Sequence, residues 1–132
     1  MTYSYLIITP TVRRPIIEII VKSKDKFAIY PVLIDSGADY CIFNIELAEA
    51  FGVKLSKKKV TLHGLSKGAI TGRYGEIGLR ITNQTYKATV LFAEIGHFDH
   101  GILGQQGFFD HFDVKLSYQK QTVEIESVKF SN

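Results

Sequence analysis

The sequence lacks the features that point to an oxidising compartment or to a membrane. Its 132 residues include one cysteine, Cys41, and a single thiol cannot close a disulfide within the chain. No apolar stretch approaches the roughly 20 residues that cross a bilayer. The apolar segment 1–10 also lacks the basic start and the small-residue cleavage site of a signal peptide. We therefore expect a cytoplasmic protein with no membrane partner.

A strong excess of charge is absent as well. The formal net charge of +3 is mild, and the lysines are scattered apart from the triplet Lys57-Lys58-Lys59. Such a triplet is typical of a solvated loop, so the composition predicts no nucleic-acid partner. The length and the hydrophobic fraction of 45% fit one globular domain over residues 1–132.

The acidic turn Asp35-Ser36-Gly37-Ala38 occurs once, and a second Asp-Ser/Thr-Gly is missing. It follows the apolar run 27–34, which predicts a buried strand. A carboxylate that a buried strand delivers into a tight turn is costly to ionise alone, which makes it a candidate for acid–base chemistry. An Asp before Ser-Gly can also form a turn simply by bonding its own backbone. The tetrapeptide alone leaves both interpretations open.

The rest of the sequence reads as mostly β. The run 16–21 and the run 27–34 flank a polar turn and predict a hairpin. Alternating apolar residues predict four further strands, around Ile77–Ile81, Tyr86–Phe92, Val114–Tyr118 and Val123–Ile125.

Two short helices are expected between these strands. Asn44 can cap the first, over residues 45–51, and Gly52 can end it. Residues 105–112 predict the second, with Phe108, Phe109 and Phe112 facing inward.

Glycines mark a second hairpin. Residues 60–63 and 69–71 read as strands around the glycine-bracketed tip 64–68, which can flex. Gly72, Gly75 and Gly78 follow at intervals of three residues. No Lys-Ser/Thr follows them, so they do not form a phosphate loop, and they predict close backbone approach or bulging.

These features occur in a characteristic order: Asp35-Ser36-Gly37-Ala38 after a buried strand, the glycine-bracketed hairpin, then Ile102-Leu103-Gly104 before an aromatic segment and a final strand pair. The order resembles that of the retropepsin-like aspartic proteases, the single-lobe family that includes the retroviral proteases. The resemblance covers about residues 14–126. It implies an all-β, closed-barrel-like lobe with one or two short helices.

The resemblance also implies a site. Asp35 would be the catalytic residue of an aspartic endopeptidase, paired with Asp35 of a second copy in a homodimer that cleaves a peptide or protein without cofactor or metal. Ser36 and Gly37 would support the catalytic carboxyls, and the tip 64–68 would be the flap that closes over the substrate. The residues implied to bind substrate are Gly37, Ala38, Asp39, Gly64, Leu65, Ser66, Lys67 and Gly68.

The sequence departs from the family at three places. Retroviral members pair the residue matching Asp39 with an arginine directly after the Ile-Leu-Gly motif, whereas this chain has Gln105. Asp39 is then held by neutral hydrogen bonds or by another cation, such as Arg13, Arg14 or Arg73. The flap tip is less glycine-rich. The segment 1–10 and the tail from Ser127 have no clear counterpart, and they could add interface strands or bind elsewhere.

Other functions remain open on the sequence alone. The same lobe could be a non-catalytic dimeric peptide-binding or scaffold module, or a lobe that is inactive until processed or until it meets a partner. The segments 97–100 and 110–113 alternate His and Asp with aromatic residues, but neither spacing matches a recognised metal-ligand motif. Cys41, with the apolar neighbours Ile42 and Phe43, is expected to be a buried small residue and not a nucleophile.

Overall fold

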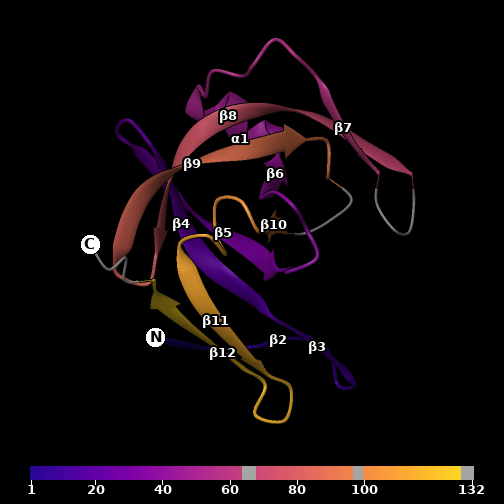
Figure 1. Cartoon of the computed structure of the whole chain (residues 1–132), viewed down its shortest axis with the longest axis vertical. Helices are drawn as coiled ribbons and strands as arrows, with labels where there is room; N and C mark the ends of the chain where they lie inside the picture. The colour runs from indigo at the N-terminus through magenta and orange to yellow at the C-terminus, as the bar shows by residue number, and fades with distance from the viewer. Residues whose placement is uncertain (64–67, 97–99, 129–132) are drawn as a thin grey trace.

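The chain folds almost entirely into strands, as the apolar alternation predicts. A computed structural model describes residues 1–63, 68–96 and 100–128 (Figure 1). In sheet order, the large sheet contains β4 (Ile16–Ser23), β5 (Lys26–Ile34), β10 (Gly101–Leu103), β6 (Ile42–Asn44), β9 (Gln84–Ala93), β8 (Ala69–Ile81) and β7 (Val60–His63). Because β4 pairs with β8 as well as with β5, this sheet closes on itself. The expected all-β, closed-barrel-like fold is confirmed.

Two smaller sheets lie beneath the barrel (Figure 1). One has the order β1 (Thr2–Ser4), β12 (Thr122–Ser127) and β11 (Phe112–Ser117), and the other pairs β2 (Leu6–Thr9) with β3 (Val12–Arg14). The N-terminal residues without a family counterpart therefore form a strand and a hairpin. Strand β1 pairs with β12 of the same chain, and the amino group of Met1 donates to the carbonyl of Ile125 at 2.9 Å.

The alternation along β8 and β9 builds the main core. Ile77, Leu79 and Ile81 of β8 are buried, as are Ala88 and Val90 of the neighbouring β9. They pack with residues of β4, β5, β11 and β12 in one cluster. Within the described residues, no helix has the length and hydrophobicity that a membrane crossing requires.

The first expected helix is confirmed, with the caps that the sequence indicates. Helix α1 (Ile45–Phe51) begins after Asn44, whose side chain accepts a hydrogen bond from the backbone N–H of Glu46. It ends at Gly52, which adopts a left-handed conformation with φ of 64°. That conformation costs glycine little, since it has no Cβ.

The second expected helix, over residues 105–112, is wrong. The segment is a series of turns in which the N–H of Phe109 donates to Gly104 and that of Asp110 donates to Gln105. Gly107 interrupts any right-handed helix with φ of 100°, and its N–H donates instead to the Asp110 side chain. Hydrophobicity still directs the aromatic rings as expected, because Phe108 and Phe112 are buried and Phe109 is half-buried.

The three spaced glycines of β8 are positions of close approach, as predicted. A Cβ on Gly72 would lie 2.4 Å from the carbonyl oxygen of Phe92 in β9. One on Gly75 would lie 2.7 Å from Val53, and one on Gly78 would lie 3.0 Å from the carbonyl oxygen of Lys22. These glycines let β8 pass tightly over its neighbours.

The single cysteine belongs to the core, as expected. Cys41 is fully buried, and its sulfur accepts a hydrogen bond from the N–H of Gly104 at 3.4 Å. Burial raises the pKa of the Cys41 thiol to about 12; the Gly104 hydrogen bond opposes the rise, and the charge of Asp110 adds to it. The thiol is therefore protonated and shielded at neutral pH, which is the opposite of what a nucleophile needs.

We predict that Gly72→Ala lowers the free energy of unfolding by about 2 kcal/mol, because the new methyl group collides with a backbone oxygen that cannot move alone. Urea denaturation followed by circular dichroism measures the change. Gly96→Ala is the matched control, since nothing lies within 4 Å of a Cβ at Gly96, and its effect should stay within about 0.5 kcal/mol. Equal losses in the two variants would contradict the close approach.

We predict that thiol reagents modify Cys41 at pH 8 only after unfolding. The unfolded thiol loses its proton near pH 8.5, whereas the folded thiol keeps it to about pH 12. Above pH 8.5 the unfolded chain thus binds fewer protons, so the free energy of unfolding should fall as the pH rises towards 12. The fall should be smaller in Cys41→Ala. Rapid modification of the native protein would contradict this environment.

Candidate active site

Asp35 stands where two parallel strands end together. Strand β5 pairs in parallel with β10, with Ile34 opposite Leu103, so the residues that follow both strands emerge at the same edge. The backbone N–H of Asp35 donates to the carbonyl of Leu103 at 3.0 Å, and the Asp35 side chain is half-buried. The two motifs that the sequence singled out are therefore in direct contact.

The turn after Asp35 orients its carboxylate. The N–H of Ala38 donates to the Asp35 carbonyl at 3.2 Å, and the N–H of Gly37 donates to the carboxylate oxygen Oδ1 at 3.0 Å. In the described part of the chain, the other oxygen, Oδ2, accepts no hydrogen bond. The turn thus uses one carboxylate oxygen and leaves the other available, so the turn-forming and the chemical interpretations of Asp35 are compatible.

Residues after β10 clamp the rest of this loop. The N–H of Gln105 donates to the carbonyl of Ala38 at 2.8 Å, and the N–H of Gln106 donates to that of Asp39 at 3.0 Å. Gly104 makes the approach possible, because a Cβ there would lie 2.3 Å from the carbonyl oxygen of Tyr40. Backbone hydrogen bonds therefore fix the Asp35 loop from one side.

Gln105 adds a side-chain contact that sequence reasoning missed. Its amide Nε2 donates to the carbonyl oxygen of Ser36 at 2.9 Å, across 69 positions of sequence. The only signal was a polar residue directly after Ile-Leu-Gly, at the position where the resemblance expects an arginine. In this chain the residue holds the backbone of the Asp35 loop and not the Asp39 carboxylate.

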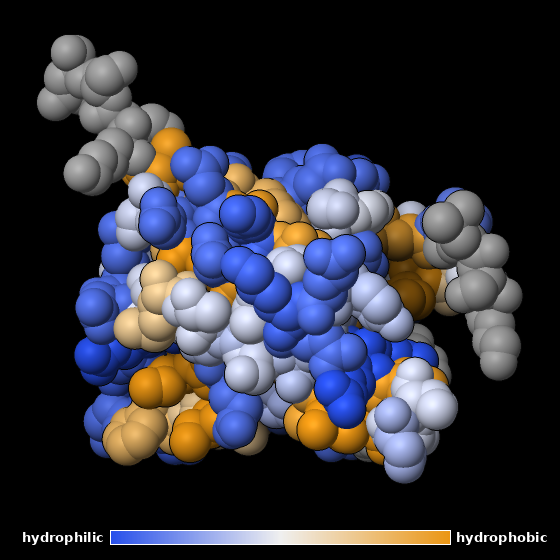
Figure 2. All heavy atoms as spheres, turned by 90° about the horizontal axis from the view of Figure 1, so that it is seen from below, coloured by the Kyte–Doolittle hydropathy of each residue, from blue (hydrophilic) through white to orange (hydrophobic). Residues whose placement is uncertain are grey.

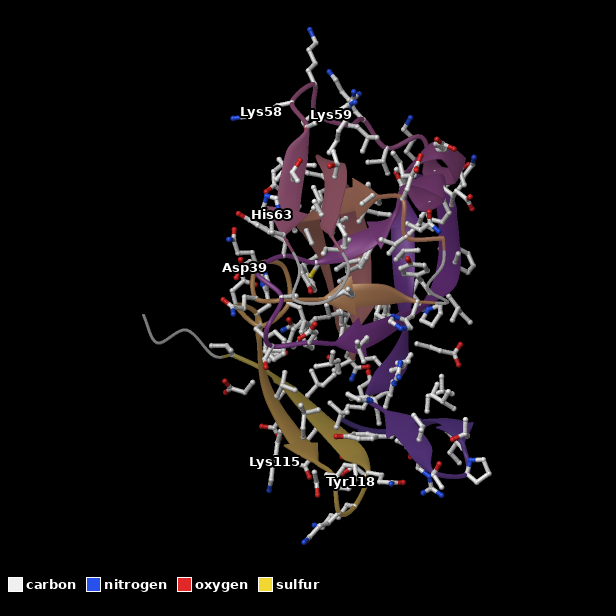
Figure 3. All side chains as sticks on the ribbon, turned by 90° about the vertical axis from the view of Figure 1, so that its right-hand side faces the viewer. Asp39, Lys58, Lys59, His63, Lys115 and Tyr118 are labelled. Carbon is white, nitrogen blue, oxygen red and sulfur yellow. The ribbon has the colours of Figure 1, made fainter. Side chains whose placement is uncertain are left out.

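Asp39 has no cationic partner among the described residues. Its side chain is exposed, and Figure 3 shows it on the same side of the molecule as His63 at the end of β7. Of the arginines considered as substitutes, Arg13 donates instead to the side chain of Gln121. The N–H of Gln106 holds the backbone carbonyl of Asp39 and not its carboxylate. Within the described residues, neither of the two expected arrangements fixes the Asp39 side chain.

The β7–β8 hairpin is anchored beside the same loop. Leu62 of β7 and Ile70 of β8 pack against a buried cluster that Ile102 of β10 also contacts. The buried members of the cluster are Ile42, Leu91, Ala93 and Ile95. Gly68 lies in this hairpin with φ of 85°, whereas Gly64, Leu65, Ser66 and Lys67 lie outside the described residues.

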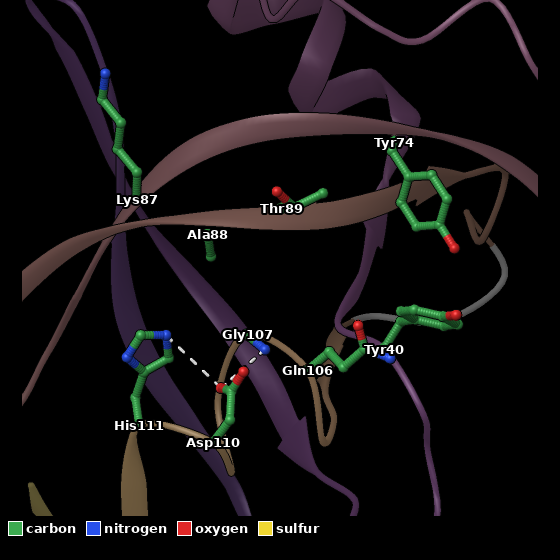
Figure 4. Close-up of a pocket in the computed structure, with 9 residues that line it drawn as sticks. All are labelled: Tyr40, Tyr74, Lys87, Ala88, Thr89, Gln106, Gly107, Asp110 and His111. Atoms are coloured by element: carbon green, nitrogen blue, oxygen red, sulfur yellow. Dashed lines mark hydrogen bonds and ion pairs between the residues drawn. The ribbon is translucent and has the colours of Figure 1, made fainter. Parts of the chain in front are cut away.

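A cavity of about 470 Å³ lies beside Tyr40, at the end of the loop (Figure 4). Tyr40 and Tyr74 stand at one end, with ring centroids 5.6 Å apart, and burial together with the neighbouring Tyr40 raises the pKa of Tyr74 to about 12. At the other end Asp110 lies 3.7 Å from His111 Nε2.

Of the segments that alternate His and Asp with aromatic residues, residues 97–99 lie outside the described part of the chain. Within that part, no group of three or more His, Cys, Asp or Glu residues is placed to hold an ion.

Comparison with known proteins places this geometry in a family. The family model described as aspartyl protease matches residues 20–106, which is more than half of the chain. No curated protein matches the sequence. Among solved structures, EIAV protease in complex with the inhibitor HBY-793 is similar, with 17% sequence identity and a TM-score of 0.54 over 75% of this chain and 88% of that chain.

At this identity the structural likeness concerns the fold, and the family model carries the assignment. The matched region contains β5, the Asp35 loop, the β7–β8 hairpin and the turn at Gln105. The chain therefore belongs to the aspartyl protease family and has the retropepsin-like fold.

Proposed function

We propose that the chain is an aspartic endopeptidase whose active site forms between two copies, each contributing Asp35. Membership of the aspartyl protease family supports proteolytic activity. The observation that carries the shared site is the single half-buried Asp35, whose Oδ1 accepts from Gly37 while Oδ2 has no partner among the described residues. The given sequence has one Asp-Ser-Gly, so in this proposal the second carboxylate comes from a second copy.

Two carboxyl groups about 3 Å apart cannot both be ionised, so they share one proton. The charged carboxylate accepts a proton from a water molecule held between them, and the water oxygen bonds to the peptide carbonyl carbon. The protonated carboxyl donates its proton to the carbonyl oxygen. The C–N bond then breaks as the amine nitrogen takes a proton from the dyad, and one hydroxyl of the tetrahedral intermediate returns a proton to the dyad as the carbonyl re-forms. The pair acts as one titrating unit.

The neighbouring residues have supporting roles in this proposal. Ser36 is exposed, and its hydroxyl makes no hydrogen bond within the described residues, so it is available to the opposite loop across the twofold axis. Gly37 lets the substrate backbone approach, and Ala38 and Asp39 extend the same edge. The β7–β8 hairpin, with residues 64–68 at its tip, closes over an extended peptide and excludes water.

We predict that Asp35→Asn lowers kcat for peptide cleavage by a factor of about 10³ or more, because the amide can neither accept nor share the catalytic proton. The assay is cleavage of a peptide library at acidic pH, read by mass spectrometry. The variant should remain a dimer in analytical ultracentrifugation. Full activity in Asp35→Asn would refute the assignment. Peptide binding without turnover by the native dimer would instead favour the scaffold module.

We predict that Gln105→Glu reduces kcat about tenfold near pH 6, with a smaller effect on KM. An ionised carboxylate accepts hydrogen bonds only, so it repels the Ser36 carbonyl that the amide holds at 2.9 Å. Protonation of the introduced carboxylate restores a hydrogen-bond donor to the Ser36 carbonyl. The ratio of variant to native activity should therefore rise as the pH falls through about 4.3.

The matched control is Gln106→Glu. It places the same charge one residue further on, where the Gln106 side chain makes no hydrogen bond to any described residue. Its activity relative to the native protein should stay near constant with pH. If the two variants had the same pH profile, the effect of Gln105→Glu would be one of charge alone and the positioning role would be wrong.

A further inference from the structure

A row of residues crosses three neighbouring strands on the outer face of the barrel. Lys22 of β4 lies opposite Gly78 of β8, and Gly78 lies opposite Lys87 of β9. Residues opposite one another in antiparallel strands point to the same face, and both lysines are exposed. The flanking residues of β8, Ile77 and Leu79, point the other way and are buried in the core. The row therefore presents two ammonium groups on the outside of the barrel with a glycine between them.

Gly78 leaves a gap between the two lysines. Adjacent strands lie about 4.8 Å apart, so the Cα atoms of Lys22 and Lys87 are separated by about 10 Å. A Cβ at Gly78 would lie 3.0 Å from the carbonyl oxygen of Lys22, so the glycine also lets β4 and β8 approach closely. A cavity of about 510 Å³ opens over this position, and we call it the recess. Its floor at Gly78 is backbone, and lysines stand on both sides of that floor.

The side chains around the recess carry more positive charge than negative. Lys22, Lys24 and Lys87 line it together with one carboxylate, that of Glu76. None of the three ammonium groups forms an ion pair within the described part of the chain. Like charges gathered in one place repel one another, and an anion that enters between them relieves the repulsion. The recess therefore favours a ligand with negative charge.

One of these lysines occupies a backbone position that favours glycine. Ser23 and Lys26 pair at the end of the β4–β5 hairpin, so Lys24 and Asp25 form a two-residue turn. Lys24 has a φ of 57°, in the left-handed region where a side chain is disfavoured. Thr82 has the same φ in the β8–β9 turn and carries no charge. A glycine at either position relieves the backbone, but only the change at Lys24 removes a charge from the recess.

An exposed aromatic ring continues the row beyond Lys22. Phe27 of β5 lies opposite Lys22 and is 72% exposed. Figure 2 shows hydrophilic side chains over much of the underside of the molecule, so polarity alone singles out no surface. The row differs in its order, which is a ring, a cation, a gap and a second cation. That order complements a peptide segment in which a large apolar side chain adjoins acidic ones.

A peptide fits the recess better than an anionic membrane surface does. Glu76 lies two residues from Gly78 on the same face of β8, and it is exposed. A continuous layer of lipid phosphates cannot avoid this carboxylate and is repelled by it. A peptide can place single acidic side chains over the lysines and pass beside Glu76.

The recess lies far from the Asp35 loop. The β4–β5 turn is at the opposite end of β5 from Asp35 (Figure 1). Strand β5 has nine residues and therefore spans about 30 Å. An extended chain covers at most about 3.6 Å per residue, so at least about nine residues must separate a bond at Asp35 from a segment in the recess.

We propose that the recess is an exosite, a second site on the enzyme that binds an acidic segment of the protein substrate away from the cleaved bond. The inference rests on the proposed function, because it takes the substrate to be a protein cleaved at Asp35. Acidic side chains of the segment lie over Gly78 between Lys22 and Lys87, and its apolar side chain contacts Phe27. Binding there raises the effective concentration of the cleavable bond at the active site, which lowers KM and leaves kcat unchanged.

The first test measures binding alone, with Asp35→Asn as the background so that the probe is not cut. The probe is a fluorescein-labelled peptide, Gly-Phe-Glu-Glu-Asp-Glu-Gly, and its control has Gln and Asn in place of the acids. Fluorescence anisotropy gives the Kd. We expect Lys22→Gln and Lys87→Gln each to raise the Kd of the acidic probe about fivefold. Glu76→Gln should lower that Kd, because it removes the one negative charge that lines the recess.

A matched pair of glycine variants separates binding from stability. Lys24→Gly and Thr82→Gly both place glycine at a left-handed turn position, so neither should lower the midpoint of urea denaturation. Only Lys24→Gly should raise the Kd of the acidic probe. Equal Kd values in the two variants would show that the charge of Lys24 has no part in binding.

The second test measures cleavage by the native chain. A segment that the chain cuts is joined to the acidic peptide by a Gly/Ser linker of about four or about 20 residues, of which only the longer can span the 30 Å. We expect the longer linker to lower KM about tenfold relative to the segment alone, and the shorter to have no effect. Lys22→Gln should abolish this gain and cut the plain segment normally.

Four results would overturn the exosite. Equal binding of the acidic probe and its neutral control would exclude an anion site, and native Kd values in both Lys→Gln variants would place the anion elsewhere. Binding to phosphatidylserine vesicles but not to the probe would make the row a membrane contact. Equal KM for all three substrates would remove the exosite while Asp35-dependent cleavage kept the proposed function. Lysine-dependent binding with no Asp35-dependent cleavage would instead overturn the proposed function, and the exosite with it.

Discussion

The parallel pairing of β5 with β10 is the constraint on which the site depends. It brings Ile34 and Leu103 side by side, so that Asp35 and Gly104 leave the barrel at the same edge. The hydrogen bond from Asp35 N–H to the Leu103 carbonyl then fixes where the carboxylate begins. Because the main chain makes most of these contacts, the described residues hold the loop in place without an ion pair. A rigid, partly buried carboxylate is what shared-proton chemistry requires.

Local chemistry in the sequence accounts for much of the fold. Helix α1 follows from Asn44 and Gly52, which supply its two caps, and β8 and β9 follow from apolar alternation. The second helix failed because apolar spacing indicates which residues face inward but not the backbone conformation. Gly107 adopts a positive φ there, and the sequence does not show which of its allowed backbone conformations a glycine adopts.

The site was predictable only in part, for a related reason. Asp35 could be singled out because its turn follows an apolar run and because Ile102-Leu103-Gly104 occurs later in the order typical of the family. The Gln105 amide contacts the Ser36 carbonyl across 69 positions of sequence. No periodic pattern in the sequence predicts a contact between a side chain and so distant a carbonyl. The pairing of β1 with β12 joins residues at the two ends of the chain and is hidden in the same way. The functional tip of the β7–β8 hairpin at residues 64–67 remains a proposal.

Gln105 stands where the family resemblance expects an arginine paired with Asp39, and it makes a different contact. The backbone of the Asp35 loop is held by a neutral amide, and the Asp39 carboxylate stays exposed at its edge. In the proposed dimer, the Asp39 carboxylate is therefore open to contact with the substrate.

The most direct measurement mixes the native chain with Asp35→Asn at constant total concentration, where all chains are dimeric, and follows peptide cleavage. A site built from one carboxyl of each copy predicts that activity falls as the square of the native fraction, because mixed dimers lack one acid. Activity that falls in simple proportion to the native fraction would contradict a shared site, since each native copy would then work alone.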